Sequence, residues 1–162
     1  DPYCPWCLAY DPTMNSLKSR YADVLTFEYH ILPTHSESLA LKYGTENVSL
    51  AAKYYACAQN QSKLDEFKAC AIAEYNEHTE VPLDKTELDA CANSSKLNTT
   101  ELGACLAGAD SILEFSKKLA ETYLSPSLST PAVVLNCQYR TSPRFAESAI
   151  CYLAPSASAC PK

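Results

Sequence analysis

Two cysteines near the start of the chain have the spacing that reversible disulfide chemistry requires. They belong to the sequence Cys4-Pro5-Trp6-Cys7. If a helix begins here, the first thiol lies beside unpaired N–H groups at the positive end of the helix dipole, which favours the thiolate. The two-residue gap lets the second sulfur resolve a mixed disulfide. The motif predicts Cys4 as the more exposed, attacking thiol and Cys7 as the resolving thiol one turn inside.

The same spacing has two other interpretations, half of a zinc site and a permanent structural disulfide. A zinc site needs a second close cysteine pair, and the sequence has no other C-x-x-C. We therefore expect no metal site and no bound cofactor, since the electrons of thiol exchange reside in the dithiol. Asp11 and Glu28 are candidate proton carriers for Cys7, although ordinary surface carboxylates without a catalytic role are the commoner interpretation.

The amino-acid composition limits the class of protein and the compartment in which it is expected. The chain has 162 residues, 47% hydrophobic and 20% charged, with a net charge of −6, which suits one soluble domain and disfavours nucleic acid as a partner. Nine cysteines and four N-x-[ST] sequons favour an extracytoplasmic location: secreted, periplasm-like, at the cell surface, or in a lumen like that of the lysosome or endoplasmic reticulum. The candidate glycosylation sites are Asn47, Asn60, Asn93 and Asn98.

Hydrophobic patterning predicts an α/β domain spanning 1–162. Two apolar runs rich in β-branched residues, 24–32 and 132–135, are typical of strands. Between them, a helical insertion of about residues 40–124 carries apolar residues at helical spacing. Gly103 and Gly108 weaken its last helix and predict a joint there.

At three spaced points the sequence resembles the thioredoxin superfamily. These are the C-x-x-C motif, Pro12 five residues after Cys7, and Thr130-Pro131 immediately before the second predicted strand. The resemblance implies a thioredoxin fold with a large helical insertion. It also implies a cis Thr130–Pro131 bond against the two sulfurs, with the Thr130 backbone open to an extended substrate. Pro5, Trp6, Thr130 and Pro131 would then form the substrate-binding surface.

The large insertion resembles the DsbA-like branch of that superfamily, and its later part is similar to the gamma-interferon-inducible lysosomal thiol reductase family. Membership would imply a thiol–disulfide oxidoreductase acting on protein or peptide thiols and disulfides, with a redox partner protein. The similar segments are Tyr55-Ala-Cys57, Glu66-Phe-Lys-Ala-Cys70, Cys105 with Gly108, Leu119-Ala-Glu-Thr122, Pro131-Ala-Val-Val-Leu-Asn136, and the paired cysteines from Ile150-Cys151 to Ala159-Cys160.

The same fold places a central strand before its C-x-x-C, whereas three residues precede Cys4 in this sequence. We expect that first strand to be missing here, and to lie upstream or to be donated by another chain. An open sheet edge would favour strand donation or oligomer contact. The alternative function is a non-catalytic secreted structural or binding protein, in which Cys4 and Cys7 form a permanent bridge in a disulfide-rich scaffold.

Six further cysteines are expected to form structural disulfides, although sequence alone allows 15 connectivities. A bridge near the C-terminus would close a short local loop and clip the tail 151–162. Cys137, at a predicted hairpin turn, is the odd cysteine and is expected to be a free thiol or a link to another chain; a small buried thiol is the alternative. The preferred pairs are Cys57–Cys70, Cys91–Cys105 and Cys151–Cys160.

Overall fold

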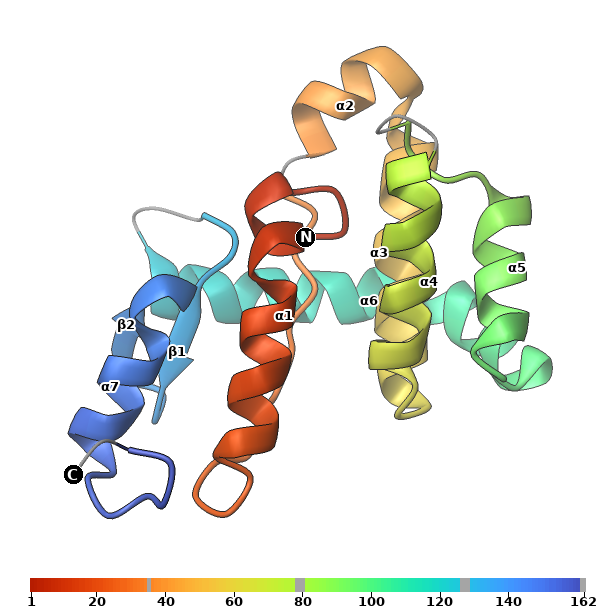
Figure 1. The fold of residues 1–162 in the computed structure, drawn as a ribbon. Coiled ribbons are helices and arrows are strands. Elements are labelled where there is room, and N and C mark those ends of the chain that lie inside the picture. Colours follow the sequence, from red (N-terminus) through yellow and green to blue (C-terminus); the bar gives the residue numbers. More distant parts are fainter. Residues whose placement is uncertain (35, 78–80, 126–128, 161–162) are drawn as a thin grey trace.

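The computed structural model describes residues 1–34, 36–77, 81–125 and 129–160. Figure 1 shows how their elements are arranged. In chain order these are α1 (Pro5–Arg20), α2 (Ser36–Tyr43), α3 (Thr45–Asn60), α4 (Leu64–Glu77), α5 (Lys85–Ser94), α6 (Thr99–Leu124), β1 (Val133–Leu135), β2 (Tyr139–Thr141), a 3₁₀ turn at Pro143–Phe145 and α7 (Ala146–Leu153).

The fold is mostly helical, so the expected α/β thioredoxin fold is wrong. In the described part of the chain, the one sheet is a two-stranded antiparallel hairpin in which Val134 pairs with Arg140. The predicted strand over 24–32 forms no ladder; it runs as an elongated segment alongside α1 (Figure 1). Its β-branched and aromatic residues match a strand, but a strand also needs a hydrogen-bonded neighbour, which no other described segment provides.

Helix α1 positions the cysteine motif at its N-terminus. Cys4 is the N-cap, with extended backbone angles, and Pro5 occupies the first helical turn, where its missing N–H costs nothing. Lys18 and Arg20 lie in the last turn, where positive charge complements the helix dipole. The helix continues through Pro12 to Arg20.

Helices α3 to α6 form a second body whose core contains Tyr54, Phe67 and Leu88, none of them exposed. Their ends follow local capping rules: the Asp84 side chain and Glu87 form a reciprocal capping box at α5, and Asn98 caps α6. Helix α6 is continuous over Thr99–Leu124, so the joint expected at Gly103 and Gly108 is wrong. Packing against α3 stabilises a helix that propensity alone would weaken.

The six structural cysteines form three disulfides, but two of the expected pairings are wrong. The bonds are Cys57–Cys105, Cys70–Cys91 and Cys151–Cys160, of which the last confirms the expected terminal pair. The first joins α3 to α6 and the second joins α4 to α5. Each bond joins two helices that pack against each other, and which helices pack together cannot be deduced from the spacing of the cysteines.

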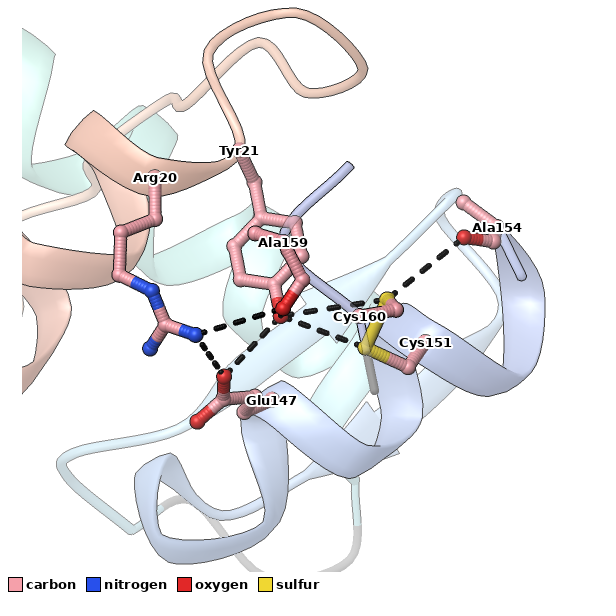
Figure 2. Close-up of polar contacts among 7 residues, drawn as sticks. All are labelled: Arg20, Tyr21, Glu147, Cys151, Ala154, Ala159 and Cys160. Atoms are coloured by element: carbon pink, nitrogen blue, oxygen red, sulfur yellow. Dashed lines mark hydrogen bonds and ion pairs between the residues drawn. A yellow bond between two sulfur atoms is a disulfide. The ribbon is translucent and has the colours of Figure 1, made fainter. Parts of the chain in front are cut away.

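A third region joins the far end of α1 to α7 and the tail. The ring of Tyr21 is fully buried, and its hydroxyl lies 3.0 Å from Glu147 Oε1, 3.4 Å from the Ala159 carbonyl oxygen and 3.3 Å from Cys151 Sγ (Figure 2). Arg20 Nη2 donates to the same Glu147 oxygen. The Cys151–Cys160 bridge therefore holds the tail against the helix that begins at Cys4.

Candidate functional site

The N-terminus of α1 places two free thiols side by side. Cys4 is the N-cap and Cys7 is the third helical residue, and neither is in a disulfide. The backbone N–H groups of Cys7 and Trp6 lie near enough to the Cys4 sulfur to favour its thiolate. They are among the N–H groups that no carbonyl within the helix can satisfy, so a negative charge on the sulfur is stabilised there.

The surroundings shift the pKa values of the two thiols in opposite directions. Burial raises the pKa of Cys4, but hydrogen bonds from the Cys7 and Trp6 backbone and from the Thr130 and Cys7 side chains outweigh it, so the net pKa is lowered. Burial raises the pKa of Cys7, and a charged Cys4 raises it further. The pair therefore favours a thiolate on Cys4 and a proton on Cys7.

The exposure of the two thiols does not match this assignment. The prediction that Cys4 is the more exposed thiol is wrong. Cys4 is 2% exposed, whereas Cys7 is half-buried. The cause is Tyr3, which is itself buried. Its hydroxyl accepts a hydrogen bond from the Leu83 N–H at 3.1 Å, and its ring centroid lies 5.0 Å from that of Tyr75. This anchor draws the residue before Cys4 into the helical core.

The Thr130–Pro131 loop closes over the same sulfurs. The bond is cis, which confirms the prediction, and the Cys4 thiol donates to the Thr130 carbonyl oxygen at 3.4 Å across 126 positions of sequence. The Thr130 hydroxyl lies 2.9 Å from that of Thr34, which ties the loop to the end of the elongated segment. Pro131 lines a cavity together with Cys7.

Two residues between the cysteines lie on the outside of the motif. Trp6 is 66% exposed, and Pro5 is exposed beside it. An exposed tryptophan next to two thiols offers an apolar contact surface to a polypeptide. The structure thus brings Pro5 and Trp6 to the same end of α1 as the cis loop.

A buried ion pair lies one helical turn beyond Cys7. Asp11 Oδ1 is 2.5 Å from Lys68 Nζ, and the side chains are 20% and 10% exposed. The ammonium also lies 5.2 Å from the Tyr29 ring centroid, and burial followed by the charges of Asp65 and Asp11 raises the pKa of Tyr29 to about 12. Sequence analysis missed Lys68; the signal was a lysine on the apolar face of α4.

The other candidate proton carrier for Cys7 is Glu28. Glu28 is largely exposed, with Oε1 3.2 Å from His30 Nε2. Glu28 therefore fits the interpretation as an ordinary surface carboxylate better than a role in proton transfer from Cys7.

Cys137 is an exposed free thiol at the turn of the β1–β2 hairpin. It adopts a positive φ of 54°, next to Asn136 at 51°, and these two residues are the centre of a turn that the Gln138 N–H closes by donating to the Leu135 carbonyl oxygen at 3.1 Å. Its thiol contacts the Tyr123 hydroxyl, which raises the pKa of that tyrosine. The structure keeps Cys137 away from the three disulfides.

Three of the four candidate glycosylation sites are exposed: Asn60, Asn93 and Asn98. The Asn98 side chain is already in use, because its oxygen caps the N–H groups of Thr100 and Glu101. The side chain of Asn47 lies outside the described residues.

Residues 1–34, 36–77, 81–125 and 129–160 show neither a metal site nor a membrane span. No group of three or more histidine, cysteine, aspartate or glutamate side chains there could hold a metal ion. None of the helices described is both long and apolar enough to cross a membrane. The chain matches no protein-family model, no curated protein and no solved structure. Functional inference therefore rests on the geometry of the two thiols.

Proposed function

We propose that the protein is a thiol–disulfide oxidoreductase that works through Cys4 and Cys7. The observation that supports it most is the position of Cys4 at the N-terminus of α1, where two helix N–H groups favour its thiolate, with a second free thiol beside it. This arrangement lowers the pKa of one thiol and raises that of the other. Nucleophilic and resolving roles require such a difference.

The atoms and electrons of the thiol–disulfide exchange balance without a bound cofactor. The Cys4 thiolate attacks one sulfur of a substrate disulfide, forming a mixed disulfide and releasing a substrate thiolate. Cys7, as it loses its proton, attacks the Cys4 sulfur and releases the second substrate thiolate. Two electrons have then moved from the dithiol to the substrate, and a partner dithiol protein returns them; the reverse sequence oxidises a substrate dithiol.

The proposed substrates are protein or peptide thiols and disulfides. Trp6 and Pro5 supply an exposed apolar surface beside the thiols. Thr130 and Pro131 supply the backbone next to the Cys4 sulfur. Because Cys4 is 2% exposed, we expect a substrate to displace the loop before attack.

Three disulfides are compatible with an extracytoplasmic protein. Within that class, we propose an oxidising compartment: secreted, periplasmic, at the cell surface or luminal. Exposed sequons at Asn60 and Asn93 fit such a location.

The rival function is a structural or binding protein with Cys4–Cys7 as a permanent bridge. The reduction potential of the pair separates the two. A value in the range of known exchange enzymes, about −120 to −270 mV, supports catalysis, whereas one below about −300 mV supports the bridge.

Trapping identifies the attacking thiol. In a background carrying Cys137→Ser, the variant Cys7→Ser should accumulate a mixed disulfide with a disulfide-linked peptide, while Cys4→Ser should not. Accumulation only in Cys4→Ser would assign attack to the more exposed Cys7. Absence of any mixed disulfide in both variants would contradict the proposed function.

A further inference from the structure

The segment 24–32 has the side-chain pattern of a strand. Leu25, Phe27, Tyr29 and Ile31 pack inward, whereas Val24, Thr26 and Glu28 are exposed. This alternation is that of an extended chain. Among the described residues, no backbone hydrogen bond is donated by the N–H groups of 26–31, so these donors are open, although the Tyr29 carbonyl oxygen accepts from Gln59 Nε2 at 2.7 Å.

The same two helices sandwich both this segment and β1. Leu25 and Phe27 pack with Leu17 and Tyr21 of α1, and so do Val133 and Leu135. Leu32 packs with Ala120 and Leu124 of α6, and so do Ala132 and Val134. Leu25 and Phe27 thus lie on the α1 side and Leu32 on the α6 side, so both segments lie between helices at this end of the molecule. In Figure 1, α1 lies in front of the segment 24–32, α7 lies in front of the hairpin, and α6 lies behind.

A cavity of about 690 Å³ lies between the two segments. Its edges are residues 24–32 and β1, whose second edge is unpaired within the described sheet. Its two faces come from α1, through Leu8 and Met14, and from α6, through Leu119 and Ala120. We call this cavity the strand slot. It offers a polypeptide two open backbone edges and two apolar faces.

We propose that the strand slot binds an extended segment of another polypeptide chain, about six residues long and apolar on both faces. The length follows from the open N–H groups of 26–31 and matches an ordinary strand. Both faces must be apolar because helices cover both, as in buried strands of other proteins. Backbone pairing supplies affinity and the faces supply selectivity. Cys7, Thr130 and Pro131 also line this cavity, so the slot borders the thiol pair, but binding of a peptide without cysteine requires no thiol exchange.

Synthetic peptides test the proposal on the full chain. The probe is a fluorescent Val/Ile octapeptide flanked by lysines, and its matched control is the same peptide N-methylated at alternate residues. We expect saturable 1:1 binding of the probe and at least tenfold weaker binding of the control, since N-methylation removes the donors. Amide exchange should slow at 26–31 and 133–135. Equal binding of both peptides, no saturable binding, or protection elsewhere would overturn the proposal.

Two variants at one exposed position give a second test. Thr26→Pro removes an N–H donor from the slot edge, whereas Thr26→Val keeps it. We expect the proline variant to bind the probe at least tenfold more weakly and the valine variant to bind as the parent does, with both folded by circular dichroism. A dimer formed through segment 24–32 in the absence of peptide would assign the slot to a second copy and overturn the proposal.

Discussion

Lys68 Nζ lies 2.5 Å from Asp11 Oδ1, which pins α4 to the helix that carries the two thiols. The lysine side chain is 10% exposed, so its charge is poorly solvated without that carboxylate. A second carboxylate, Asp65, is 3.5 Å away and is shared with Lys18. The wall of the cavity beside Cys7 thus contains a charge pair whose members depend on each other.

We predict that Asp11→Asn destabilises the fold by about 1–3 kcal/mol, because it leaves Lys68 buried with only the more distant carboxylate. The double variant Asp11→Asn/Lys68→Met should recover much of that loss, since methionine keeps the packed stem without the charge. Denaturant unfolding of both single variants and the double variant measures the coupling. Additive losses would show that the pair contributes no mutual stabilisation.

The opposite pKa directions of the thiols predict different alkylation profiles. In the Cys7→Ser/Cys137→Ser variant, the rate for Cys4 should reach half its maximum below pH about 8.5, the ordinary cysteine value, because helix N–H groups stabilise its thiolate. In the Cys4→Ser/Cys137→Ser variant, the midpoint for Cys7 should lie above that pH, because burial disfavours its thiolate. Burial of Cys4 slows its alkylation at every pH without moving the midpoint. Coinciding midpoints would contradict the assignment of roles.

Local sequence signals predicted the parts of the site that depend on neighbours in the chain. Pro5 after Cys4 marks a helix start, whereas the cis Thr130–Pro131 bond was implied by the resemblance to the thioredoxin superfamily. Burial of Cys4 could not be predicted, because it depends on Tyr3 meeting Leu83, 80 positions away.

Helix packing likewise determined features that spacing left open. Cys57 could pair with Cys70 or Cys105 until the contact of α3 with α6 was known. The run 24–32 has the residues of a strand, but strand formation depends on a neighbour that no described segment supplies. Sequence therefore predicted the elements better than their partners.

The Tyr21 hydroxyl gives a test of the contact between α1 and the tail. Tyr21→Phe should destabilise the fold by about 1 kcal/mol, since it removes the one hydroxyl proton that is shared between Glu147 Oε1 and the Ala159 carbonyl oxygen. Tyr152→Phe is the matched control: that ring is 82% exposed, and we expect a change within about 0.5 kcal/mol. Thermal unfolding of both variants makes the comparison. Equal stability of the two would show that the Tyr21 hydroxyl contributes nothing measurable.

The hairpin turn at Asn136 and Cys137 gives a prediction about backbone strain. Both residues have the positive φ values of the central pair of a type I′ turn, which favours glycine at its second position, where Cys137 has φ 54°. A side chain at this position costs about 1 kcal/mol, so Cys137→Gly should stabilise the fold. The greater conformational freedom of glycine in the unfolded chain offsets part of that gain. Cys137→Ala isolates the backbone effect, because it removes the thiol and keeps the Cβ atom. We expect glycine to exceed alanine in unfolding free energy by about 0.5–1 kcal/mol, measured by denaturant titration under conditions that keep the three disulfides intact. Equal stability of the two variants would mean that the turn relaxes to another conformation, and a less stable glycine variant would contradict the assigned backbone.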